Sequence, residues 1–252
     1  MPKPENWPER SVRLALGGVL FGAGGFFSAA WAAIFGKRGD GLTAAVLAGF
    51  AIVALGFATA VILSQLGQVT VDATHDSIGT KLKVDRVITL LFTVALVAAV
   101  PSGVLFVIFV PRGTVGIPMS SGERIFTPYL IGIGVAFAVV GLIAMVTRGG
   151  PGYILLTPQG FEITDIFFTR KGLWEDVINI TDEAPDKRTP FTISLIMRND
   201  PPRVIQGAYS YTPCGRGLYW MLRHYWSHQE NRQELIDGRA LERLRNERFE
   251  VN

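Results

Sequence analysis

The chain has 252 residues, of which 49% are hydrophobic and 18% are charged, and its formal net charge at pH 7 is +3. Because 24 Lys and Arg are interleaved with 21 Asp and Glu, the chain lacks the basic stripe of a nucleic-acid-binding protein, and no nucleic-acid partner is expected. The only cysteine, Cys214, excludes an internal disulfide framework and is typical of a reducing compartment.

Four long apolar stretches organise the first half of the chain. They cover residues 12–35, 42–66, 87–110 and 129–147, and apart from Arg13 they contain no Asp, Glu, Lys or Arg. At 1.5 Å per helical residue, each is long enough to cross a hydrocarbon core of ~30 Å. The sequence therefore predicts an all-α four-helix transmembrane domain over residues 12–147, with buried helices of a soluble protein as the alternative.

The N-terminal tail, residues 1–11, is short and mixed in charge, and Trp7 is expected at the membrane interface, where indole rings are enriched. A cleaved signal peptide is the alternative, although the first apolar stretch exceeds the ~7–15 residues of a signal's apolar core. Basic residues are more numerous on the tail's side of the helices than on the other side. The positive-inside rule therefore predicts a multi-pass protein of the cell (inner) membrane with both termini in the cytoplasm.

Small residues recur at close-packing intervals in the apolar stretches. Gly18 and Gly22 have GxxxG spacing in the first stretch, Gly56 and Ala60 repeat it in the second, and Gly132 lies on a small face of the fourth. Such residues let helix backbones approach closely. Gly18, Gly22, Gly56 and Gly132 are therefore candidate helix-packing residues, either within one molecule or in a homo-oligomer.

Two connections between the apolar stretches carry further signals. Residues 67–86 alternate between apolar and polar side chains around a turn at His75 and Asp76, which predicts a cytoplasmic β-hairpin that leans on the soluble domain or on the helices. Pro101 predicts a kink in the third helix, and a transport site is the less favoured explanation because few polar groups accompany it. Residues 111–128 are expected to form an extracytoplasmic loop.

The second half, from Arg148, alternates in the manner of strands and ends in a helical pattern. Strands are expected at residues 152–157, 161–168, 173–180, 191–197 and 203–206, with Lys171 and Gly172 turning the second strand into the third. Leu218, Met221, Leu222 and Tyr225 form one apolar stripe, which predicts a helix over 215–228. The pattern indicates a cytoplasmic α+β domain over 148–228, a small barrel or sandwich covered by its C-terminal helix.

One part of this half resembles a known family. The run Tyr-Ile-Leu-Leu-Thr-Pro-Gln-Gly-Phe-Glu-Ile at 153–163, the pair Arg170 and Lys171, and the run Leu-Trp-Glu-Asp-Val-Ile-Asn-Ile at 173–180 are similar to bacterial pleckstrin-homology-like (PH-like) domains of small membrane proteins. The resemblance covers residues 152–228. It implies a seven-stranded barrel with a C-terminal helix and a binding or scaffolding role, and a detached fragment from residue 151 onwards is then expected to fold.

Five basic residues are candidate contacts with a membrane surface or a partner protein. They are Arg148, Arg170, Lys171, Lys187 and Arg188. Each basic group near anionic lipid contributes about 1 kcal/mol, although nearby acidic residues favour ordinary solvated charge. Phosphoinositide recognition is not expected, because the turn at residues 157–160 carries no basic side chain.

No catalytic, cofactor-binding or metal-binding residue is predicted. His224 and His228 are one helical turn apart but have no evident third ligand. Residues 229–252 are densely charged with both signs, which predicts a solvated or partly frayed helix, with docking to another protein as the alternative.

Together these patterns predict a non-enzymatic integral membrane protein without a cofactor. Its partners would be the lipid bilayer and another membrane or cytoplasmic protein, which the PH-like module binds in scaffolding an envelope complex. An accessory subunit of a transporter or membrane enzyme complex is the first alternative. A sensor of anionic lipid at the inner membrane surface is the second.

Overall fold

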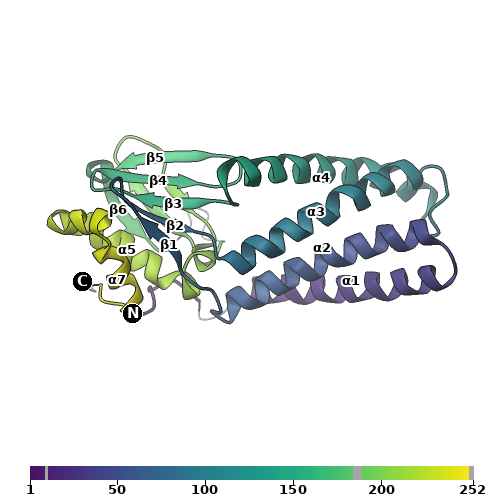
Figure 1. The fold of residues 1–252 in the computed structure, drawn as a ribbon, viewed down its shortest axis with the longest axis horizontal. Helices are drawn as coiled ribbons and strands as arrows, with labels where there is room; N and C mark the ends of the chain where they lie inside the picture. Colours follow the sequence, from purple (N-terminus) through teal and green to yellow (C-terminus); the bar gives the residue numbers. More distant parts are fainter. Residues whose placement is uncertain (9–10, 184–188, 250–252) are drawn as a thin grey trace. The chain divides into compact units, whose positions relative to one another are not determined.

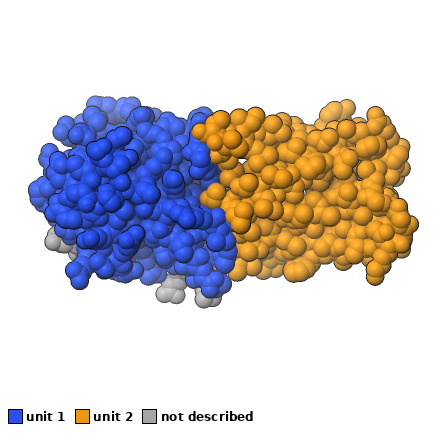
Figure 2. Space-filling model, viewed as in Figure 1, with its two compact units in different colours: residues 1–12, 63–88, 148–252 blue, residues 13–62, 89–147 orange. Residues whose placement is uncertain are grey.

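The computed structural model describes residues 1–8, 11–183 and 189–249, and the chain divides into two compact units (Figures 1 and 2). One unit contains residues 13–62 and 89–147 and is called the membrane unit. The other contains residues 1–12, 63–88 and 148–252 and is called the sheet unit. The chain therefore passes between the two units four times.

Four long helices form the membrane unit: α1 (Val12–Lys37), α2 (Gly41–Gln65), α3 (Arg86–Phe109) and α4 (Ser121–Arg148). Each is long and apolar enough to cross a membrane. Large apolar side chains remain outside the protein interior, such as Phe26, which is 71% exposed, and Val146, which is 83% exposed. Such surfaces are stable against lipid and not against water, so the prediction of a multi-pass membrane protein is confirmed.

The helices approach each other most closely at three glycines. A Cβ added to Gly25 of α1 would lie 2.7 Å from the Leu55 Cγ of α2. A Cβ on Gly49 of α2 would overlap Ser102 of α3, and one on Gly103 of α3 would overlap Val135 of α4. Consecutive helices are thus packed through small residues, as expected where lipid gives no hydrophobic driving force for association.

The fourth helix begins at Ser121, which is earlier than the predicted residue 129. Residues 121–128 of the expected loop 111–128 therefore belong to α4, and the loop is shorter than predicted. The Ser120 N–H donates to the Glu123 carboxylate, and the Ser120 hydroxyl accepts from the Glu123 N–H. This reciprocal capping box starts the helix. Pro128 lies within its second turn, where one backbone hydrogen bond is lost without ending the helix.

The sheet unit contains eight strands among the described residues, arranged as two antiparallel sheets. The first sheet has the order β1 (Asp72–His75), β2 (Thr80–Lys83), β3 (Tyr153–Leu156), β4 (Gly160–Thr164) and β5 (Thr169–Leu173). The second has the order β6 (Val177–Thr181), β7 (Ile193–Met197) and β8 (Arg203–Ile205). The count differs from the seven strands that the family resemblance implied.

Two of the eight strands, β1 and β2, come from the connection between α2 and α3, so six strands lie within residues 152–228, which the resemblance covers. The predicted hairpin forms, with Asp76 Oδ1 accepting from the N–H groups of Ile78 and Gly79 in its turn. β2 pairs antiparallel with β3, and Leu82, which is fully buried, stands opposite Ile154. The hairpin is therefore part of the sheet, because its marginal two strands gain a third partner and a core.

One buried carboxylate fixes the hairpin at the point where α3 begins. Asp85 is 1% exposed, and its Oδ1 accepts from the N–H groups of Val87 and Ile88, which caps the helix. Its Oδ2 accepts from the N–H and the hydroxyl of Thr70. Burial raises the pKa of Asp85, but these hydrogen bonds outweigh burial and hold the pKa below its ordinary value.

The strand boundaries around Arg170 and Lys171 differ from the prediction. The expected strand 161–168 ends at Thr164, because Asp165 forms a turn in which its Oδ1 accepts from the N–H groups of Phe167 and Phe168. Arg170, Lys171 and Gly172 then lie within β5 instead of forming a turn.

The second sheet and a C-terminal helix enclose the core of the sheet unit. In α5 (Arg216–Ser227), the predicted apolar stripe Leu218, Met221, Leu222 and Tyr225 is fully buried. Trp174 is also buried, as expected. Ser194 of β7 and the preceding Thr192, which alternate with apolar residues, are buried as well. The Ser194 hydroxyl is satisfied by donating to the Glu183 carbonyl at 2.6 Å.

The segment after α5 packs onto the sheet unit and is not a solvated tail. It forms a 3-10 turn (Gln229–Gln233), α6 (Glu234–Asp237) and α7 (Arg239–Arg245). The weak stripe of the sequence is buried here, including Leu235, Leu241 and Leu244. Glu234, which is 5% exposed, accepts two hydrogen bonds from Arg243 and one from the Tyr225 hydroxyl. The charged segment thus contains a buried carboxylate, Glu234, which pairs with Arg243 and attaches the segment to α5 through Tyr225.

Candidate functional site

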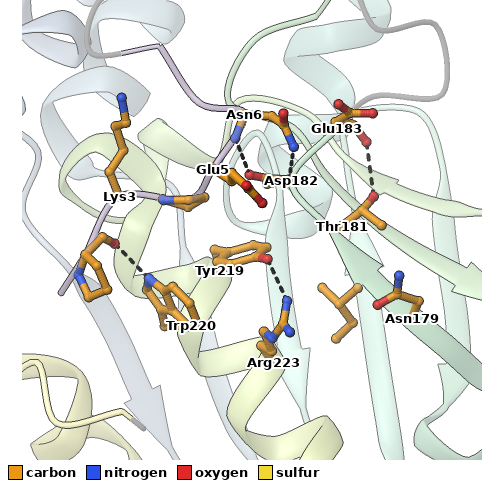
Figure 3. Close-up of a pocket in the computed structure, with 13 residues that line it drawn as sticks. Lys3, Glu5, Asn6, Asn179, Thr181, Asp182, Glu183, Tyr219, Trp220 and Arg223 are labelled. Atoms are coloured by element: carbon orange, nitrogen blue, oxygen red, sulfur yellow. Dashed lines mark hydrogen bonds between the residues drawn. The ribbon is translucent and has the colours of Figure 1, made fainter. Parts of the chain in front are cut away.

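A pocket of the sheet unit lies where the N-terminal segment meets β6 and α5 (Figure 3). It has a volume of about 660 Å³. Its walls are residues 2–6, residues 179–183 and three α5 side chains, namely Tyr219, Trp220 and Arg223. The three walls come from distant parts of the chain, and all three belong to the sheet unit.

The N-terminal segment is held in place by hydrogen bonds at both of its ends. The Trp220 indole N–H donates to the Pro2 carbonyl at 2.9 Å. The Asn6 backbone N–H and side-chain amide donate to the two carboxylate oxygens of Asp182 at 2.7 and 3.0 Å (Figure 3). Asp182 therefore holds the turn of residues 4–7 through two hydrogen bonds from Asn6.

Trp7 anchors this segment in the core. It is 3% exposed, its ring lies against Phe191 and Tyr219, and its indole N–H donates to the Asp182 carbonyl at 2.9 Å. The predicted place of Trp7 at the membrane interface is therefore wrong. The physical reason is that an aromatic pocket and a carbonyl acceptor satisfy both the ring and its N–H.

Charged groups of both signs line the pocket, and Arg223 is the cation that α5 contributes. Its guanidinium donates to the Tyr219 hydroxyl at 3.1 Å, and no carboxylate in the described parts of the chain lies within ion-pairing distance of it. Lys3 and Glu5 also line the pocket. A guanidinium carries five donors in a planar fork, which suits a carboxylate or phosphate.

β6 contributes an open sheet edge to the same pocket. Within the part of the chain that the structure describes, it is the outer strand of its sheet, since β7 pairs with it on one side only. The Trp226 indole N–H donates to the Val177 carbonyl at one end of β6, and Trp7 donates to the Asp182 carbonyl just beyond the other end. Asn179 and Ile180 lie between these two bonds. An open edge of this kind offers backbone donors and acceptors to an added strand.

The lining of the pocket offers several kinds of recognition chemistry. Among the described residues, it contains no His, Cys or Ser. Its side chains supply hydrogen-bonding groups, an arginine fork and aromatic surface.

The five predicted surface cations do not form one cluster in the described chain. Lys171 pairs with Glu162 at 2.9 Å, and Arg170 pairs with Asp165 at 3.1 Å. Arg148 donates to the carbonyls of Asp165 and Ile166. Lys187 and Arg188 lie outside the described residues.

Glu162 shows why Lys171 is committed to a partner inside the protein. Burial raises the pKa of Glu162, but hydrogen bonds from Tyr153 and Lys171 outweigh burial and hold the pKa below its ordinary value. The same ion pair raises the pKa of Lys171. Arg170 and Lys171 already have acidic partners, so the structure gives less support to a lipid-sensing surface made of several basic residues.

The four predicted packing glycines face neighbouring helices. A Cβ on Gly18 would lie 3.2 Å from Val61, and one on Gly22 would lie 3.8 Å from Ala58. Gly56 faces α3, and Gly132 faces Val107 of α3 with ordinary spacing. The tightest contacts, at Gly25, Gly49 and Gly103, were not among the predicted packing residues. Tightness depends on helix rotation, which GxxxG spacing does not specify.

The histidines and the cysteine occupy structural positions. His224 is 2% exposed and its ring stacks on that of His228 at 4.6 Å. No group of three or more His, Cys, Asp or Glu in the described chain could hold a metal ion. Cys214 lines a smaller pocket of about 430 Å³.

Several residues of the main pocket were missed by reasoning from sequence. Asp182 and Arg223 carry no sequence motif that marks them as pocket residues. A signal that could have pointed to them is the pairing of exposed polar residues with Tyr219 and Trp220 on one amphipathic helix. The N-terminal segment, which forms the facing wall of the pocket, lies more than 170 positions from Asp182 in the sequence and leaves no local pattern.

The chain matches no protein-family model, no curated protein and no solved structure.

Proposed function

We propose that this chain is a non-enzymatic membrane protein whose sheet unit binds an extended segment of a partner protein. The unit is proposed to be a PH-like module, and its two antiparallel sheets followed by an apolar helix support this assignment. The partner would be another membrane or cytoplasmic protein, and the role would be scaffolding of an envelope complex.

The observation that carries the proposal is the open edge of β6 beside α5. A strand added to this edge would gain backbone hydrogen bonds, while its side chains would enter the pocket between β6 and α5. The Asp182 side chain already accepts the backbone N–H of Asn6 from the N-terminal segment at this place. The site therefore has the chemistry for main-chain recognition.

The electrostatics of the pocket indicate the kind of segment that fits. Arg223 can form a bidentate contact with a carboxylate, and its partial burial strengthens that contact relative to an exposed ion pair. An extended partner segment with an acidic side chain next to its strand-forming residues would satisfy both the β6 edge and Arg223.

The proposed orientation places the sheet unit in the cytoplasm of a cell with an inner membrane. All four connections to the membrane unit lie on one side of the membrane, and Arg13, Lys81, Lys83, Arg86 and Arg148 are located near them. A membrane-impermeant thiol reagent added to intact cells should label a cysteine at Thr114 and should not label one at Asn199. The reverse pattern would invert the topology.

The binding proposal is tested by photo-crosslinking in native membranes. A photoreactive amino acid replaces Asn179, which lines the pocket, or Asn199, which is exposed in the β7–β8 turn and serves as the matched control. Position 179 should yield one protein adduct of discrete mass whose crosslinked peptide is an extended acidic segment, and position 199 should not.

A charge reversal makes the test specific. Arg223→Glu should abolish the adduct at position 179, whereas Arg198→Glu, at an exposed arginine outside the pocket, should leave it unchanged. Equal adducts at both photoreactive positions, or an adduct insensitive to Arg223→Glu, would overturn the proposal.

A further inference from the structure

The turn between β4 and β5 exposes two adjacent aromatic side chains. Phe167 is 48% exposed and Phe168 is 61% exposed. The other phenylalanines described in the sheet unit, Phe161, Phe191 and Phe249, are all buried. Two adjacent aromatic side chains that are exposed together would be stabilised by an apolar environment outside the sheet unit.

The turn is held in one conformation by Asp165. Its Oδ1 accepts from the N–H groups of Phe167 and Phe168 at 2.9 and 2.7 Å, and its N–H donates to the Phe168 carbonyl. Arg170 donates to Asp165 Oδ2, and its guanidinium lies 5.6 Å from the centre of the Phe168 ring. The phenylalanines are thus presented by a fixed turn.

Arg148 fixes where this turn lies relative to the bilayer. It is the last residue of α4, and its guanidinium donates to the carbonyls of Asp165 at 2.8 Å and Ile166 at 3.3 Å. The uncharged part of α4, from Ile125 to Thr147, is about 35 Å long at 1.5 Å per residue, enough to cross the ~30 Å hydrocarbon core. Arg148 therefore ends the span at the boundary between acyl chains and headgroups, and it binds the turn there.

We propose that the β4–β5 turn inserts Phe167 and Phe168 into the boundary between headgroups and acyl chains of the bilayer that α4 crosses. The occupant is the apolar edge of the lipid itself, and not a particular anionic headgroup, because Asp165 already balances Arg170. The turn is thereby a second membrane attachment of the sheet unit. Phe167 lies 19 residues beyond Arg148, the last residue of α4. The inference does not depend on what enters the β6–α5 pocket.

The experiment measures the depth of a spin label in the full-length chain. Phe168→Cys is made in a Cys214→Ser background, labelled with a nitroxide and reconstituted into phosphatidylcholine liposomes. Collisions with oxygen, which partitions into lipid, are compared with collisions with a water-soluble nickel chelate. Ile178→Cys, at a residue of β6 that is 52% exposed, is the matched control in the same background.

The label at position 168 should collide with oxygen in preference to nickel, and the label at 178 should show the reverse. The ratio at 168 should not change when phosphatidylglycerol is added or when the salt concentration is raised, because the insertion is apolar. Phe167→Cys provides a second site in case labelling at 168 disturbs the turn. Nickel accessibility at both 167 and 168 equal to that at 178, or insertion only with anionic lipid, would overturn the proposal.

Discussion

The sheet unit should fold only when its three chain segments are present together. An excised fragment of residues 148–252 contains β3–β8 and the C-terminal helices but lacks the β1–β2 hairpin and the N-terminal segment. β3 would become an edge strand, and the core would lose the fully buried Leu82, Val69 at 4% exposure and Trp7 at 3%. We therefore expect this fragment to remain largely unfolded.

The size of the effect follows from these three side chains. Burial of each contributes about 1.5–3 kcal/mol, so their loss removes about 5–9 kcal/mol. Domains of this size are stable by about 5–15 kcal/mol in total. The loss is therefore comparable with the whole free energy of unfolding, before the hydrogen bonds between β2 and β3 are considered.

The assay compares the fragment with a soluble chimera. In the chimera, residues 1–12, 63–88 and 148–252 are joined by two flexible Gly/Ser linkers in place of the membrane unit. The chimera should show dispersed amide resonances and cooperative urea unfolding, and the fragment should show neither. If the fragment unfolded cooperatively at the same urea concentration as the chimera, the assignment of the hairpin to the core would be refuted.

Three further predictions concern single residues. Asp85→Ala should lower the melting temperature of the detergent-solubilised full-length protein, because it removes a helix cap and two bonds to Thr70, whereas Asp76→Ala in the exposed hairpin turn should lower it less; equal losses would contradict the role of Asp85. Burial raises the pKa of Glu234, but its hydrogen bonds and ion pair outweigh burial and hold the pKa below its ordinary value of 4.5. The ionised Glu234 therefore stabilises the fold above pH 4.5, and this contribution is lost as the pH falls through the lower folded-state pKa. Glu234→Gln should therefore flatten the stability of the chimera between about pH 6 and about pH 3, and an unchanged slope would count against the ion pair. Gly49→Val should lower the thermal stability of the detergent-solubilised full-length protein because a Cβ there overlaps Ser102, whereas Gly24→Val, with nothing within 4 Å, should be tolerated.

The features that were predicted correctly are those with a strong local signal. The four helices are recognisable because continuous apolarity over a membrane's thickness is a property of each stretch by itself. The hairpin turn at Asp76 and the stripe of α5 are also local, since they depend on turn chemistry and helical periodicity. The capping box at Ser120 and Glu123 was equally local, and the start of α4 could have been predicted from it.

The candidate site was not predictable in this way, because its walls are brought together only by long-range contacts. Asn6 and Asp182 meet across most of the chain, and neither residue carries a motif. The charged segment 229–252 was expected in solvent because its charges outnumber its apolar residues. Tertiary structure buries Glu234 against Arg243 and thereby permits the sparse apolar positions to pack.

The amino-acid sequence by itself determined that this chain crosses a membrane and carries a strand-rich unit, because lipid and alternating burial each impose a periodic pattern on consecutive residues. Only the tertiary structure decided that residues 72–83 complete the sheet, that Trp7 lies in the core, and that β6 and α5 share a pocket with the N-terminal segment. The physical reason is that strand pairing and core packing join residues by complementarity in space, which distance along the chain does not record.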